Sequence, residues 1–214
     1  MRRLITEFIG TFFLVFIIGM VAAGDRISVL AIGFGLMVLV YMGGPISGAH
    51  YNPAVTFALL LGKRIKGGEA VGYWLSQIVG GAAGALAAHY LTGVTFAPMP
   101  GVGVDVAKAL VNEVLFTFLL VMVIHMVAVH PKAVGTHFYG FAIGATIVAA
   151  AYAGGGISGG AYNPAVSIGP SLVNAAISNG SIEYMWITVV GPLLGATLAY
   201  FVYEFIAKED LPST

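Results

Sequence analysis

The longest stretch of the chain without a charged residue runs from residue 133 to residue 182, fifty residues with no Asp, Glu, Lys or Arg. A soluble domain carries about 25% charged residues, whereas this chain of 214 residues has 8% charged and 59% hydrophobic residues. About 20 apolar residues are enough to cross a bilayer, so the stretch is long enough for two crossings. The sequence therefore predicts an integral membrane protein.

The chain begins with two arginines and an apolar stretch that ends in small residues, MRRLITEFIGTFFLVFIIGMVAAG, a pattern that secretory signals share. We favour a first membrane span instead, because the stretch carries Glu7 and has a counterpart later in the chain. With about 20 apolar residues for each span, the sequence predicts six spans. They cover residues 4–23, 27–44, 69–91, 107–129, 135–154 and 182–207.

Two apolar pieces remain, one after Asn52 and one after Asn163, and both are too short to cross a bilayer at about 1.5 Å per residue. We expect each piece to enter the membrane and turn back. Basic residues gather on the cytoplasmic side of membrane proteins, and only Arg26 and Lys108 lie on the minority side of the six-span model. This predicts a multi-pass protein of the cell (inner or plasma) membrane with both termini in the cytoplasm. The cytoplasmic set is Arg2, Arg3, Lys63, Arg64, Lys66, Lys132 and Lys208.

The two halves of the chain repeat each other. ISGAHYNPAVTF at 46–57 matches ISGGAYNPAVSI at 157–168 in eight of twelve positions, at an offset of 111 residues. Upstream, Glu7 pairs with Glu113 at an offset of 106 residues. We expect a single membrane domain over 1–214, with one repeat in 1–105 and the other in 106–214. Each repeat holds three spans, an odd number, so the second repeat is inverted in the membrane.

The repeated Asn-Pro-Ala is the motif with chemical meaning. Asn caps free backbone N–H groups and Pro suits the first helical position, so each motif starts a half-helix near the membrane midplane. Irregular backbone survives at that depth only where protein buries it or water wets it. We expect the segments just before the two motifs, residues 46–51 and 157–162, to be extended, with carbonyls that line a wet pore; we call these segments the approaches. The positive ends of the two half-helices would face each other and oppose cations.

On these motifs the chain resembles the aquaporins, the major intrinsic protein family, with a bacterial-type NPAV in place of NPAR at the second motif. The resemblance implies an aquaporin-like all-α fold of six transmembrane helices and two re-entrant half-helices in inverted repeats, assembled as a homotetramer. It places both Asn-Pro-Ala motifs at the pore centre and His50 in the cytoplasmic approach, with Gly159 and Ala161 in the other. The motif residues are Asn52, Pro53, Ala54, Asn163, Pro164 and Ala165.

Glu7 and Glu113 are the only acids placed well inside the predicted spans. A carboxylate in a membrane is a candidate proton or ion relay. The alternative, which the resemblance also implies, is that each accepts N–H groups from a re-entrant loop and braces it. We favour bracing, because the two glutamates occupy equivalent positions in the repeats.

The resemblance also locates an external filter at Ile32, Ala151, Gly160 and Val166. Relatives usually carry Arg at the last position, and here all four are apolar. A guanidinium would supply five donors and a permanent charge, so we expect a wide filter with weaker cation rejection. Ser167 stands where glycerol-conducting relatives usually carry Asp, which argues against a standard glycerol facilitator.

We therefore expect a passive channel for water and small neutral solutes. Alternatives are a facilitator of glycerol, urea, ammonia or metalloid hydroxides that is not optimised for water, a secondary transporter, which shares inverted repeats, and a structural membrane protein. No catalytic cluster is visible, and the remaining histidines lack metal-ligand spacing, so no enzyme, metal or cofactor is expected. A formal net charge of zero gives no sign of a nucleic-acid partner.

Overall fold

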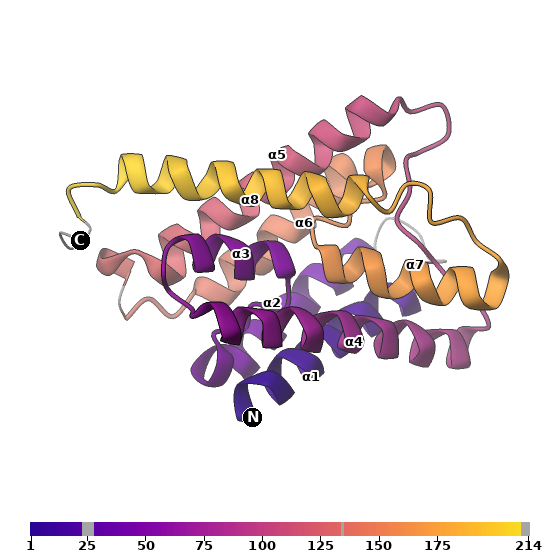
Figure 1. The fold of residues 1–214 in the computed structure, drawn as a ribbon, viewed down its shortest axis with the longest axis horizontal. Helices are drawn as coiled ribbons and strands as arrows, with labels where there is room; N and C mark the ends of the chain where they lie inside the picture. The colour runs from indigo at the N-terminus through magenta and orange to yellow at the C-terminus, as the bar shows by residue number, and fades with distance from the viewer. Residues whose placement is uncertain (23–27, 134, 211–214) are drawn as a thin grey trace.

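The computed structural model describes residues 1–22, 28–133 and 135–210, and within these ranges the secondary structure is helical throughout. Figure 1 shows long helices packed around two short ones. The α-helices are α1 (Arg2–Val21), α2 (Ser28–Ser47), α3 (Pro53–Leu61), α4 (Gly67–Thr92), α5 (Val106–Ile124), α6 (Tyr139–Ser158), α7 (Pro164–Ser178) and α8 (Ile187–Ile206). Arg26, used above to orient the chain, lies outside the described residues.

Five of these helices are long and apolar enough to cross a membrane: α1, α2, α6, α8, and α5 together with the π-helical turn His125–Val129 that follows it. The third predicted span, 69–91, corresponds to α4, which has 26 residues but is less apolar, because Glu69, Gln77 and His89 interrupt it. It is nevertheless longer than the other five helices and packs along α1. We therefore count it as the sixth transmembrane helix.

Several predicted boundaries were wrong. The fifth span begins at Tyr139 rather than residue 135 and continues to Ser158, and the last span begins at Ile187 rather than residue 182. Residues 183–186 form a turn before it. The second span runs past its predicted end to Ser47 and includes Pro45 in its last turn. Hydropathy marks apolar residues but does not separate apolar turns from helix.

Glycines allow the long helices to approach closely. A Cβ on Gly80 of α4 would lie 2.5 Å from the carbonyl oxygen of Phe8 in α1, and one on Gly191 of α8 would lie 2.6 Å from the Cβ of Glu113 in α5. At the crossing of α2 and α6, a Cβ on Gly33 would lie 2.7 Å from the carbonyl oxygen of Gly144. Small residues at such crossings are typical of membrane helix packing, where backbones meet directly.

The half-helices α3 and α7 lie between α4 and α8, roughly end to end in Figure 1. With 9 and 15 residues, they are about 14 and 22 Å long at 1.5 Å per residue, less than the roughly 30 Å of a bilayer core. Each begins at the proline of an Asn-Pro-Ala motif. Their starts meet in the middle of the bundle.

Candidate functional site

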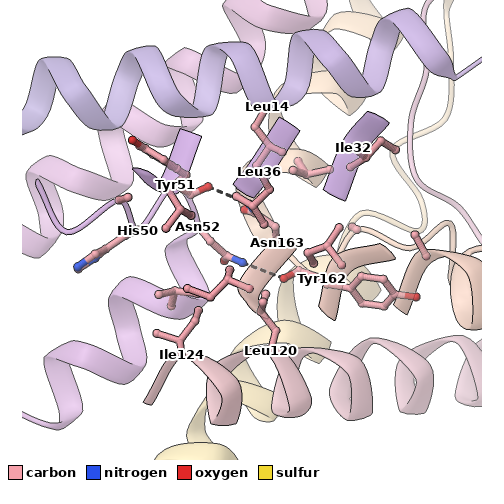
Figure 2. Close-up of a pocket in the computed structure, with 18 of the residues that line it drawn as sticks. Leu14, Ile32, Leu36, His50, Tyr51, Asn52, Leu120, Ile124, Tyr162 and Asn163 are labelled. Carbon is pink, nitrogen blue, oxygen red and sulfur yellow. Dashed lines mark hydrogen bonds between the residues drawn. The ribbon is translucent and has the colours of Figure 1, made fainter. Parts of the chain in front are cut away.

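Each asparagine of the repeated motif caps the half-helix that follows it and also contacts the other repeat. Asn52 Oδ1 accepts from the backbone N–H of Ala54, and Asn163 Oδ1 accepts from that of Ala165, both at 2.9 Å. Figure 2 shows the reciprocal contacts: Asn52 Nδ2 donates to the carbonyl of Tyr162, and Asn163 Nδ2 to the carbonyl of Tyr51, also at 2.9 Å. An amide nitrogen has two N–H donors, so each asparagine keeps a second N–H beyond this contact.

Glu7 holds the approach to α3 from within α1. Its Oε1 accepts from Ser47 Oγ at 2.6 Å and from the backbone N–H of His50 at 3.0 Å. Its Oε2 accepts from the backbone N–H of Tyr51 at 2.7 Å and from Gln77 Nε2 at 2.8 Å. The carboxylate is fully buried, and these four donors satisfy it.

Glu113 of α5 repeats this arrangement at the approach to α7. It accepts from Ser158 Oγ at 2.6 Å and from the backbone N–H groups of Ala161 and Tyr162 at 3.0 and 2.7 Å. Like Glu7 it has no exposed surface. The structure thus brings each predicted glutamate into contact with the loop of its own repeat.

The sequence led us to expect extended approaches, and this expectation was only partly right. The backbone enters the left-handed region at Gly48, Ala49 and Tyr51 (φ 87°, 51° and 47°). In the second repeat it does so at Gly159, Gly160 and Tyr162 (φ 88°, 64° and 49°). A non-glycine residue in this region costs of order 1 kcal/mol or more and persists only where the surroundings hold it. The N–H groups bound by the glutamates provide that hold.

The sequence analysis missed two tyrosines that anchor the approaches from behind. Tyr51 and Tyr162 are almost completely buried, and their hydroxyls donate to the carbonyls of Leu39 in α2 and Ala150 in α6, both at 3.0 Å. The signal was present, because a tyrosine precedes the asparagine in both copies of the motif. Gln77 had no such signal, since its counterpart at the 111-residue offset is Thr188.

An internal cavity of about 1100 Å³ passes both asparagines. In Figure 2, Leu14 and Leu36 lie on one side of the asparagine pair and Leu120 and Ile124 on the other. The cavity continues to His50 on the α3 side and to Ile32 on the other. Among the lining residues that the structure describes there is no Asp, Glu, Lys or Arg. The asparagines therefore place two amide groups in a mainly apolar wall without Asp, Glu, Lys or Arg.

The residues predicted for the filter and the approaches border this cavity. They are Ile32, Ala151, Gly160 and Val166 for the filter and His50, Gly159 and Ala161 for the approaches. The prolines and alanines of the two motifs do not line it. Pro53, Ala54, Pro164 and Ala165 are buried in the first turns of α3 and α7, where they support the asparagines from behind.

His50 belongs to a chain of polar contacts at the α3 side of the cavity. Its Nδ1 lies 3.0 Å from Thr56 Oγ1, which also accepts from Gln77 Nε2 at 3.0 Å. Gln77 in turn donates to Glu7. The histidine ring is therefore positioned by the same network that holds the loop. In the part of the chain that the structure describes, no three His, Cys, Asp or Glu side chains come together as a metal site.

Together, the helical membrane fold and the uncharged cavity between two buried half-helices define a membrane channel. The family model described as "Major intrinsic protein" matches residues 1–203. The chain belongs to the major intrinsic protein family. Members of this family are channels and not enzymes, and this chain is a passive channel for water and small solutes.

Similar proteins cover nearly the whole chain. It is 35% identical over 224 residues to the Glycerol uptake facilitator protein-like 6 of Lactiplantibacillus plantarum, with 98% of this chain and 100% of the relative aligned. It is 34% identical over 242 residues to Aquaporin AqpM of Methanothermobacter marburgensis, covering 97% and 98%. The solved structure of the aquaglyceroporin from Plasmodium falciparum shares the fold, with a TM-score of 0.85, 23% identity and 95% of each chain covered.

Proposed function

We propose that solutes cross the membrane through the cavity that passes Asn52 and Asn163. Support comes from the reciprocal contacts of these asparagines, which leave one N–H of each amide for a solute oxygen. The starts of α3 and α7 face each other there, and each carries roughly half a positive charge from its helix dipole. That charge favours neutral solutes over cations at the centre of the membrane.

We further propose that Ile32, Ala151, Gly160 and Val166 form a wide apolar filter at the external mouth. The observation that carries this proposal is that all four border a cavity whose described lining residues include no Asp, Glu, Lys or Arg. Without a guanidinium at position 166, the filter lacks both bulk and a fixed positive charge. We infer that neutral solutes besides water pass, of the class of urea, ammonia, hydrogen peroxide and undissociated metalloid hydroxides. The names of two relatives support conduction of water and of larger neutral solutes, since one is named for glycerol uptake and the other as an aquaporin.

We place the chain in the plasma membrane with both termini cytoplasmic, as a homotetramer of subunits that each contain a pore. Arg3 in the first turn of α1 pairs with Glu69 at the start of α4, and a Cβ on Gly62, just before α4, would lie 3.5 Å from the ring of Tyr200 near the end of α8. Both ends of the chain thus reach the same segment, which supports the shared side of the termini. The division into repeats 1–105 and 106–214 is supported by Gly33 and Gly144. These residues are 111 positions apart, and each approaches the other's backbone at the crossing of α2 and α6.

Stopped-flow swelling of proteoliposomes against a panel of neutral solutes tests the proposed function. We expect water and urea fluxes that rise linearly with the gradient and do not change with a sodium or proton gradient. The physical reason is that the described cavity wall has no Asp or Glu side chain, so it offers no carboxylate to bind a coupling sodium ion or to carry a proton. Saturation at low solute concentration together with ion-driven accumulation would show a secondary transporter instead.

A further inference from the structure

Helix α6 borders the cavity along one stripe of its surface. Ile143, Ile147, Ala151 and Gly155 are four residues apart and all line the cavity. Residues at this spacing lie above one another on a helix. Gly155 therefore lies one turn, about 5.4 Å, beyond the proposed filter residue Ala151, on the side nearer the end of α6.

Gly155 is the middle of the three consecutive glycines 154–156, and its surroundings differ from those of Gly154 but match the open surroundings of Gly156. At Gly154 a side chain has no room, because a Cβ would lie 2.6 Å from both the ring of Phe116 and the hydroxyl of Tyr162. At Gly155 a Cβ would meet no atom within 4 Å. The backbone at Gly155 is α-helical, so every L-residue can adopt it. Neither packing nor backbone conformation explains a glycine at 155.

Glycine is the weakest helix former after proline, so a glycine in a helix without a packing reason needs another explanation. The empty space beside Gly155 belongs to the cavity, which Gly155 lines. Its Cα lies 3.1 Å from the point that a Cβ on Gly160 would occupy. Gly155 and the proposed filter residue Gly160 thus adjoin, and together they leave one side of the external mouth without side chains.

We propose that Gly155 is a fifth size-determining position of the external filter. Its missing side chain widens the mouth one turn outside Ala151 and admits neutral solutes of the size of urea. A side chain at 155 fills this space and excludes such solutes before it excludes water. The proposal rests on the proposed function, because it assigns the external mouth to the cavity described above.

A series of substitutions tests the size role. Gly155→Ala, Gly155→Val and Gly155→Leu add volume in steps, and we expect the ratio of urea to water permeability to fall in the same order. For leucine the expected fall is about tenfold, within the discrimination that one or two methylenes give in a confined site. The matched control is Ala149→Leu, on the same helix at an exposed position outside the cavity lining, and it leaves the ratio unchanged. An unchanged ratio in folded Gly155→Leu overturns the proposal.

Thiol labelling separates this proposal from the proposed function. The chain contains no cysteine, so Gly155→Cys and the control Ala149→Cys each introduce the only thiol. We expect a membrane-impermeant methanethiosulfonate reagent to label the thiol at 155 and reduce water flux, and to leave the thiol at 149 unlabelled. If the unsubstituted chain conducts but the thiol at 155 does not react, the Gly155 proposal alone fails. If the unsubstituted chain conducts neither water nor urea, the proposed function fails, and labelling still decides whether position 155 borders an open pathway.

Discussion

The approaches to α3 and α7 share one backbone design and differ in the side chains that they present to the cavity. Both have positive φ at the same relative positions, and both are bound by a buried glutamate. In the first repeat the cavity meets Ala49 and His50, whereas in the second the equivalent residues are Gly160 and Ala161. The frame of the loop is symmetric, but the lining that a solute meets is not.

The hydrogen bonds that hold the two approaches in place also differ between the repeats. In the first repeat Gln77 joins Glu7 to Thr56. In the second, the equivalent Thr188 bonds to Ser167, and no contact from Thr188 to Glu113 is present among the described residues. Glu7 thus has one donor more than Glu113. The glutamates and tyrosines thus maintain the backbone of both approaches, while a few side-chain differences between the repeats set the size and polarity of the cavity at each end.

The largest expected effect comes from removing the glutamates that make the two approaches alike. Glu7→Leu leaves four donors without their acceptor and Glu113→Leu leaves three. Each unsatisfied buried group costs about 1–3 kcal/mol, so both substitutions should greatly reduce the yield of folded protein, Glu7→Leu more than Glu113→Leu. Size-exclusion chromatography and thermal melting in detergent measure this.

The control for the glutamate substitutions is Glu69→Leu. This residue forms a surface ion pair with Arg3, and such pairs contribute little to stability. We expect its folded yield to match that of the unsubstituted chain. Normal thermal stability of both Glu7→Leu and Glu113→Leu would refute the bracing role of the glutamates.

The next effect concerns selectivity. Val55 and Val166 occupy the same position after their asparagines, and Val166→Arg makes the two halves differ there. The guanidinium adds bulk and directional donors at the proposed filter. We expect the ratio of urea to water permeability to fall about tenfold, a difference of about 1.4 kcal/mol in barrier height. Stopped-flow measurements in matched proteoliposomes, with the oligomer content checked, test it. An unchanged or increased ratio in the folded variant would mean that Val166 is not part of the filter.

An effect on stability that is smaller than that of the glutamates is expected from the residues that make the supports of the two approaches unequal. Gln77→Leu removes two hydrogen bonds, one of them to the buried carboxylate of Glu7, and should destabilise the protein by about 2 kcal/mol. Thr188→Val removes only neutral hydrogen bonds, with Ser167 and the carbonyl of Met185, and should cost about 1 kcal/mol. Melting temperatures in detergent compare the two variants. Equal losses would show that Gln77 contributes no more to the first repeat than Thr188 does to the second.

The smallest effect is expected in the segments that follow α5 and α8, outside the membrane-spanning helices. Asp210 lies 2.7 Å from Lys132 and 3.4 Å from His130, and the hydrogen bond from Lys132 lowers the pKa of Asp210 below its usual range. A lowered pKa contributes stability that is present above the unfolded value near 4 and is lost as the pH falls through the folded value. At pH 7, Asp210→Asn should lower the melting temperature less than Gln77→Leu does. In high salt the loss caused by Asp210→Asn should vanish. A salt-independent loss would contradict a screened surface pair.

Most of the fold could be predicted from the sequence because a lipid bilayer admits few kinds of spanning segment. A span must be apolar and about 20 residues long, and the structure has helices at all six predicted places. The helix ends were less accessible, since the apolar residues before Tyr139 and Ile187 read the same whether they form a turn or a helix. The π-helical turn after Ile124 likewise has no hydropathy signal.

The sequence by itself determined that two Asn-Pro-Ala motifs would start two short helices, because capping and proline geometry act within a few residues. It also paired Glu7 with Glu113 by repetition. Only the tertiary structure decided that each asparagine donates to the tyrosine carbonyl of the other repeat, and that Gln77 reaches Glu7 across 70 residues. The same holds for Gly155, whose neighbouring space is visible only when α6 and the second approach are packed together. Contacts of this kind depend on helix packing between distant segments, which local composition and periodicity do not encode.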